Sequence, residues 1–298
     1  MIKSLQAQFG IDRIVNIIDC GVDFPVIQIH NKYASASIAL HGAQVLTFQP
    51  HGQEPVLWLS HKAFYQAGKS LRGGIPVCWP WFSDHPTRKD FPAHGFARNY
   101  VWTIRSIRQT ISEATQVSLV LEANEATRKF WPQAFELVLK VLINKELSVA
   151  LTMTNRSEQA CLFSSALHSY LQVGNIREIE ILGLENTDYL DKLQAFQHFN
   201  QQGSIRFHDE LDRIYQDTTA DIVIRDEVLK RRLKIRKTGS RTTVVWNPWI
   251  TKSAAMTDFE EGGYKNMVCV EAANAAHDSI LLQPGQSHCL QTMISVLM

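Results

Sequence analysis

Hydrophobic and polar residues alternate along much of this chain. The alternation covers residues 35–40, 101–107, 116–121 and 147–153. Residues 232–236 place arginine and lysine on one face and apolar side chains on the other. A period of two is the period of a β-strand, and one polar face indicates half-burial. The pattern therefore predicts half-buried antiparallel strands.

Two denser apolar runs, residues 135–143 and 288–297, predict strands that are covered on both faces. Helical periodicity is sparse, and residues 122–131 and 188–199 are each predicted to hold one or two helical turns. The composition does not shift along the chain, and no linker or low-complexity block interrupts it. These features predict one all-β domain over residues 1–298, a large antiparallel two-sheet sandwich.

Composition describes an ordinary globular protein. The chain has 298 residues, of which 45% are hydrophobic and 20% charged, and a net charge of +1. Such a charge provides no general attraction for nucleic acid or an anionic membrane. No run reaches the roughly 20 apolar residues of a membrane span, and residues 1–10 lack the apolar core of a signal peptide. Five scattered cysteines without a CxxC pair predict reduced thiols and a cytoplasmic location.

Other candidate binding motifs give weaker signals. The basic run at residues 230–237 alternates with Leu233 and Ile235, which favours the solvated face of an edge strand over a nucleic-acid site. The chain contains neither GxxxxGK[ST] nor GxGxxG, so any phosphate site is of another type. A metal site at His94, His168 and His277 is disfavoured because no histidine pair has the spacing of a known ligand motif.

Residues 71–99 gather unusual chemistry in one segment. They include Arg72, His94 and Arg98 together with several aromatic rings, interrupted by glycine and proline. The prolines exclude a regular helix or a central strand. An aromatic-lined loop with fixed positive charge suits a ligand that has an apolar sugar face and an anionic end. The alternative is a loop packed by its own aromatic rings, with the arginines paired to acids.

Strand parity singles out two further residues. His168 shares a strand face with the small residues Ser164 and Ala166, and Glu271 lies near the end of an apolar strand. A carboxylate is costly to desolvate without a partner. Histidine exchanges protons near neutral pH, and a partly desolvated glutamate is a base in the same range. The two residues are candidates for an acid–base pair, and the alternative is that each has only a structural role.

The chain resembles the hexose-6-phosphate mutarotases (glucose-6-phosphate 1-epimerases), within the galactose-mutarotase-like or aldose-1-epimerase superfamily. The resemblance rests on short motifs that occur in family order across about 200 residues. They lie at residues 72–76, 79–80, 94–98, 166–170, 212–215, 246–249 and 270–271. Each motif is weak alone, and the ordered set is specific.

The resemblance implies a β-supersandwich with a carbohydrate site on its concave sheet. It also implies that Glu271 takes the proton of the anomeric hydroxyl while His168 protonates the ring oxygen. The pyranose then opens, the C1–C2 bond rotates, and the ring closes on the other face. No cofactor takes part in this chemistry.

The resemblance also implies roles in substrate binding. Arg72 and Arg98 match positions that hold the substrate and its phosphate, and guanidinium groups suit phosphate oxygens. His94 matches a histidine that places the sugar hydroxyls, and Asp212 matches an acid that accepts hydrogen bonds from them. We expect a monomer that acts on a small sugar phosphate, with neither a nucleic-acid nor a membrane partner.

One position departs from the family pattern, because Ala93 stands where some relatives carry a glutamine. The signatures of free-sugar galactose mutarotases are absent, which favours the sugar-phosphate branch. Two other functions stay open at this point. One is a non-catalytic carbohydrate-binding module, and the other is a glycoside hydrolase that uses Asp212 and Glu271 as its two carboxylates. Lys252 is either a further phosphate ligand or a solvated lysine.

Overall fold

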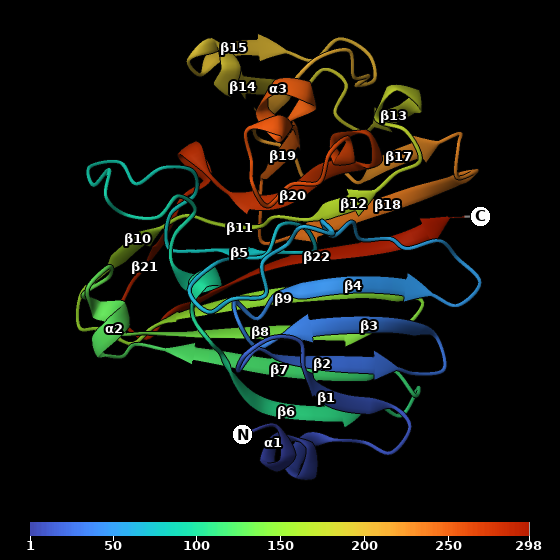
Figure 1. Ribbon diagram of the computed structural model, residues 1–298. Coiled ribbons are helices and arrows are strands. Elements are labelled where there is room, and N and C mark those ends of the chain that lie inside the picture. Colours follow the sequence, from blue (N-terminus) through green and yellow to red (C-terminus); the bar gives the residue numbers. More distant parts are fainter. Residues whose placement is uncertain (298) are drawn as a thin grey trace.

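Antiparallel β-sheets form most of the protein in the computed structural model, which describes residues 1–297 (Figure 1). One eight-stranded sheet has the order β13-β17-β18-β22-β9-β8-β7-β6. Its strands are β6 (Thr103–Gln109), β7 (Thr115–Glu122), β8 (Phe135–Ile143), β9 (Glu146–Asn155), β13 (Ile179–Leu182), β17 (Ile222–Asp226), β18 (Arg231–Thr238) and β22 (Ser287–Leu297).

A second eight-stranded sheet carries the residues of interest. Its order is β15-β14-β16-β19-β20-β11-β5, and β12 also pairs with β20. Its strands are β5 (Val77–Cys78), β11 (Ser165–Leu167), β12 (Tyr170–Gln172), β14 (Asp188–Asp191), β15 (Gln197–Asn200), β16 (Leu211–Tyr215), β19 (Thr242–Asn247) and β20 (Met267–Asn274).

Smaller elements complete the fold. A four-stranded sheet holds β1 (Val15–Asp19), β2 (Pro25–His30), β3 (Ala34–Ala39) and β4 (Val45–Pro50). A two-stranded sheet pairs β10 (Cys161–Phe163) with β21 (Ile280–Leu282). The α-helices are α1 (Ile2–Phe9), α2 (Glu125–Arg128) and α3 (Trp249–Ala254). Short 3-10 turns are η1 (Ala97–Asn99), η2 (Ile176–Glu178), η3 (Lys192–Gln194), η4 (Gly263–Asn266) and η5 (Ala276–Asp278).

The hydrophobic core lies between the sheets. Figure 1 shows β1–β4 in front of the sheet formed by β6–β9, and apolar side chains from both sheets belong to one buried cluster. Alternate residues of β9 are buried, as a strand with one covered face requires. Trp79 and Phe96 are fully buried, and Trp81 is nearly so. These three aromatic residues of the loop are therefore core anchors and do not present a ring face to a ligand.

The sandwich class and the strands predicted from alternation are confirmed, and α2 falls within residues 122–131 as expected. Residues 188–199 hold one helical turn, the 3-10 turn η3, as predicted, but strands β14 and β15 form most of this segment. The strand predicted within the basic run is present as β18, but it is an internal strand, since both β17 and β22 pair with it.

The two dense apolar runs also differ from expectation. Neither β8 nor β22 is covered on both faces along its length. Lys140 in β8 is exposed, and residues 290–295 of β22 alternate between buried and half-buried. Helices α1 and α3 have no counterpart in the sequence predictions. Among the described residues, no helix is long and apolar enough to cross a membrane.

Candidate active site

A cavity of about 260 Å³ opens on the second eight-stranded sheet. Its floor comes from neighbouring strands, with Asp212 on β16, Trp246 on β19 and Glu271 on β20. The lining includes all six residues that the sequence analysis singled out. They are Arg72, His94, Arg98, His168, Asp212 and Glu271. Residues from distant parts of the sequence thus meet on one side of one sheet.

His168 and Glu271 lie next to one another in the cavity lining. Their nearest atoms, Nε2 of His168 and Oε1 of Glu271, are 3.4 Å apart, and both side chains are buried. The imidazole stacks on the Tyr170 ring, with centroids 4.8 Å apart and planes 12° apart, and its edge meets Trp246. Among the described protein groups, neither Nδ1 of His168 nor Oε2 of Glu271 has a hydrogen-bond partner. The pair is therefore fixed in orientation and has free capacity for a ligand.

Burial sets the proton affinities of this pair. Loss of solvation raises the pKa of Glu271 well above its ordinary value, and the nearby Asp212 adds to this effect. Loss of solvation lowers the pKa of His168 well below its ordinary value, and the positive charges of Arg98 and Arg72 lower it further. In the free protein the imidazole is therefore neutral near pH 7, and Glu271 is an unusually strong base for a carboxylate.

The Arg72-Gly73-Gly74 motif has a steric explanation. Gly74 has a φ of +61°, and a Cβ there would lie 2.2 Å from the Val45 carbonyl oxygen. Gln44, fully buried, donates hydrogen bonds to the carbonyls of Leu71 and Gly73 on either side of Arg72. The loop backbone is thereby held against β4, and this fixes where Arg72 enters the cavity.

The Arg72 guanidinium is already partly engaged. It donates to Asp258 through Nε, at 3.2 Å, and to the Tyr170 hydroxyl, at 3.0 Å. Arg98 is freer, since one terminal nitrogen donates to the Ala93 carbonyl at 2.8 Å while Nε has no partner among the described groups. An arginine has five N–H donors, so both side chains retain donors for an anion.

The turn before Arg98 is equally constrained. His94 has a φ of +62°, and its Nδ1 accepts a hydrogen bond from the Ser83 backbone N–H at 3.3 Å. This bond places the proton of the neutral imidazole on Nε2. Gly95 has a φ of +75°, and a Cβ there would lie 1.9 Å from the Trp79 carbonyl oxygen. The rings of His94 and His168 meet edge to face, 5.6 Å apart.

Two lysines line the cavity as well. Lys192, in the turn η3, forms a 2.9 Å ion pair with Asp212, and Lys252 on α3 pairs with Glu210 at 2.8 Å. The sequence analysis missed Lys192, whose only available signal was the strand pairing that brings β14 beside β16. Four cationic side chains and two carboxylates therefore line the cavity, a balance that favours an anionic ligand.

The remaining candidates are also placed. Ala93 lines the cavity and uses its carbonyl to hold Arg98. His277 lies apart from the cavity lining, in an ion pair with Asp217, so it does not join His94 and His168. All five cysteines are free thiols, as expected.

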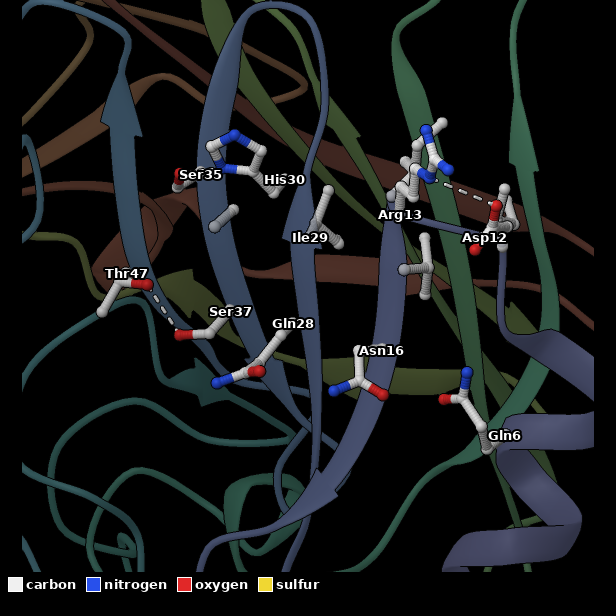
Figure 2. A pocket seen from close by; sticks show the side chains of 14 residues that line it. Gln6, Asp12, Arg13, Asn16, Gln28, Ile29, His30, Ser35, Ser37 and Thr47 are labelled. Atoms are coloured by element: carbon white, nitrogen blue, oxygen red, sulfur yellow. Dashed lines mark hydrogen bonds and ion pairs between the residues drawn. The ribbon is translucent and has the colours of Figure 1, made fainter.

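A larger hollow, of about 830 Å³, lies on β1–β3 beside α1 (Figure 2). Figure 2 shows Asn16, Gln28, Ser37 and Thr47 in a row across the four-stranded sheet, and Ser37 and Thr47 hydrogen-bond to one another. Such side chains are typical of the outer face of half-buried strands. The smaller cavity, with its buried titratable pair, is the candidate active site.

Comparisons with known proteins agree with this fold. The crystal structure of a "putative mutarotase" from Salmonella typhimurium has a TM-score of 0.90, with 31% identity over 97% of this chain and 95% of that one. A galactose mutarotase related enzyme from Lactobacillus acidophilus is only 15% identical, and its TM-score of 0.71, over 91% of this chain and 97% of that one, shows the likeness of the fold alone. The architecture is therefore of the galactose mutarotase-like class.

Sequence comparison identifies the family. The aldose 1-epimerase family profile matches residues 25–295. Proteins named "putative glucose-6-phosphate 1-epimerase" are similar along most of their length. One from Escherichia coli K12 is 34% identical over 91% of this chain and 90% of its own length. One from Cenchrus ciliaris is 38% identical over 84% of this chain and 78% of its own length. The chain belongs to the aldose 1-epimerase family.

Proposed function

We propose that this protein is an isomerase that interconverts the α and β anomers of hexose 6-phosphates, glucose 6-phosphate above all. The observation that carries the proposal is the buried His168–Glu271 pair inside a cavity lined by cations. Family membership and the names of the relatives support the same reaction. Five free thiols agree with action in the cytoplasm, and we propose that the protein acts there as a monomer.

The proposed mechanism uses the two central residues in opposite roles. Glu271 removes the proton from the anomeric C1 hydroxyl while His168 donates a proton to the ring oxygen. The bond between C1 and the ring oxygen breaks, and C1 becomes an aldehyde. Rotation about C1–C2 presents the other face of the aldehyde, and the two residues exchange roles when the ring closes. Each contributes about 10²–10⁴-fold, as is usual for positioned acid–base groups.

Substrate binding favours the protonated form of His168, which takes its proton from solvent. In the free protein Arg98, Arg72 and Lys192 all lower the pKa of His168. A bound phosphate dianion beside these cations offsets their charge, which raises the pKa of His168 and favours imidazolium. The phosphate thus contributes to reactivity as well as to affinity.

The proposal is tested by NMR saturation transfer between the anomers of glucose 6-phosphate, with free glucose and galactose alongside. Faster exchange of the phosphorylated sugar is the expected result. Glu271→Gln keeps the shape of the side chain, and His168→Asn keeps a polar amide in place of the imidazole. Each should lower the exchange rate about 10²–10⁴-fold. Binding without faster exchange would instead make the protein a carbohydrate-binding module.

The phosphate contact is tested at Arg98, which is less engaged than Arg72. A hydrogen bond to a charged group contributes about 1.5–3 kcal/mol, which corresponds to about 10–150-fold in affinity. Arg98→Gln should raise KM for glucose 6-phosphate by about this factor and leave KM for free glucose within a few-fold. Equal effects on both sugars would assign the phosphate to other groups.

A further inference from the structure

A third side chain with metal-binding capacity lies beside the acid–base pair. Cys269 and Glu271 are alternate residues of β20, so their side chains point to the same face of the sheet. His168 follows β11, the neighbouring strand. One ligand atom from each of the three lies within 4.8 Å of the others, and all three residues are buried.

The donor set matches that of a transition-metal site. Cys269 offers a sulfur and Glu271 an oxygen from the same strand, and His168 offers a nitrogen from the neighbouring segment. Zinc sites with an open position use three protein ligands of these kinds and leave the fourth position to a small molecule. His168 and Glu271 line the cavity, so the fourth position faces the space where a ligand enters.

A second observation favours an ion at this point. Oε2 of Glu271 is buried, with the residue only 2% exposed, and has no partner among the described protein groups. An unpaired buried carboxylate oxygen is costly, and a cation would satisfy it. Thiolate and imidazole ligands select zinc and similar ions over Mg²⁺ and Ca²⁺, which prefer six or more oxygen ligands.

We propose that His168, Cys269 and Glu271 form a site for Zn²⁺, or a divalent ion of similar preference, and that the bound ion reversibly inhibits the enzyme. On binding, the Cys269 thiol releases its proton to solvent, and no oxidation or reduction takes place. The inhibition rests on the proposed function, whereas the binding of the ion does not.

The inhibition follows from the ligand atoms themselves. A His168 nitrogen that holds an ion cannot deliver a proton to the ring oxygen, and a coordinated Glu271 is a weaker base. An ion held by His168 and Glu271 also lies against the cavity lining. Metal and productive substrate therefore exclude one another, and a chelator restores activity.

The test uses a background in which the exposed thiols, Cys20 and Cys289, are replaced by serine, because these surface groups would also capture metal. Co²⁺ is titrated into this protein, and thiolate ligation is followed as a charge-transfer band in the near ultraviolet. Zn²⁺ should displace the cobalt, and Mg²⁺ should not. In parallel, the exchange rate of glucose 6-phosphate anomers is measured against free Zn²⁺.

Cys269→Ala is the decisive variant, with Cys269→Ser as a second choice if the alanine variant folds poorly. Cys78→Ala is the matched control, since Cys78 is equally buried on β5 of the same sheet but lies outside the ligand cluster. We expect the Cys269 variants to lose the charge-transfer band and to exchange anomers at a rate close to that of the parent. Their inhibition should need at least about tenfold more Zn²⁺, since loss of even an outer-shell partner of a metal ligand typically costs 10–100-fold in affinity.

Two results would overturn the proposal. One is a Co²⁺ spectrum without a thiolate band in the parent protein, and the other is equal Zn²⁺ sensitivity in the Cys269 and Cys78 variants. A thiolate band in a protein that does not exchange anomers would leave the metal site standing and refute the proposed function instead. The two failures are therefore distinguishable.

Discussion

At the scale of single residues, burial decides the chemistry of the site more than residue type does. Glu271 and His168 are an ordinary glutamate and histidine whose pKa values move in opposite directions because the same sheet removes both from water. Asp212 follows the same logic, since burial raises its pKa while its ion pair with Lys192 opposes the rise. Each charged group near the cavity floor thus depends on a neighbour for its protonation state.

The first prediction concerns Lys192. Lys192→Met removes the cation that keeps Asp212 ionised, so the pKa of Asp212 should rise further. The ionised carboxylate accepts stronger hydrogen bonds from sugar hydroxyls than the protonated acid does. We expect KM for glucose 6-phosphate to increase about tenfold at pH 5.5 and less at pH 8. Lys192→Arg, which retains the charge, is the control, and a pH-independent change in KM would contradict this role.

The second prediction concerns stability. The raised pKa of Glu271 means that the folded protein holds this proton more tightly than the unfolded chain does. Its contribution to stability is therefore full at low pH and is lost as the pH rises through the folded-state pKa. Glutamine does not ionise, so the Glu271→Gln variant does not lose stability as the pH rises. Its Tm should exceed that of the parent by a few degrees at pH 8 and by less at pH 5. Thermal unfolding at both pH values measures the difference, and a lower Tm at pH 8 would refute it.

At the scale of elements, sequence periodicity predicted the strands and the face of a strand on which a side chain lies. Parity put His168 on the strand face of Ser164 and Ala166 and singled out Glu271 in its apolar strand, and the structure places both residues in the cavity lining. The same reasoning missed Lys192, because its position depends on a 3-10 turn that the Asp191 side chain caps and on the pairing of β14 with β16. It also assigned β18 to an edge, since alternation reports which face is solvated and carries no information about lateral neighbours.

The third prediction compares two glycines with nearly the same backbone. Gly95 and Gly52 have φ values of +75° and +74°, but a Cβ at Gly95 would lie 1.9 Å from the Trp79 carbonyl oxygen, and at Gly52 it would meet nothing within 4 Å. Gly52→Ala should therefore lower the free energy of unfolding by about 1–2 kcal/mol, the cost of the left-handed conformation alone.

Gly95→Ala should cost more than 4 kcal/mol, a loss expected only where a specific steric conflict exists. It should also reduce anomer exchange, because His94 and Arg98 flank the displaced turn. Urea unfolding of both variants gives the comparison. Equal losses would show that the close approach at Gly95 relaxes easily.

At the scale of the whole molecule, the fold separates the site from much of its supporting structure. In Figure 1 the helix α1 lies at the opposite end of the molecule from α3 and β14, near which Lys252 and Lys192 enter the cavity. Helix α1 packs Ile2, Leu5 and Phe9 against the core, and the Gln6 side chain accepts a hydrogen bond from the Ile17 backbone. These contacts support the four-stranded sheet without touching the cavity lining.

The fourth prediction follows from this separation. Phe9→Ala removes a partly buried ring, so it should lower the free energy of unfolding by about 1–3 kcal/mol, less than the 3–5 kcal/mol typical of a fully buried phenylalanine. The values of kcat and KM for glucose 6-phosphate should stay unchanged. Phe96→Ala is the comparison, because Phe96 is fully buried beside the turn that carries Arg98, and both stability and activity should fall. A kinetic effect of Phe9→Ala would show long-range coupling.

The origin of the cavity residues has a consequence for how such proteins diversify. Glu271, Asp212 and Trp246 stand on strands of one continuous sheet, whereas Arg72, Arg98 and Lys192 enter from connecting segments. Insertions and substitutions are tolerated in such segments far more readily than in a hydrogen-bonded sheet. Exchange of these segments between homologues should therefore transfer the preference for one sugar or another while the proton-transfer apparatus is inherited intact.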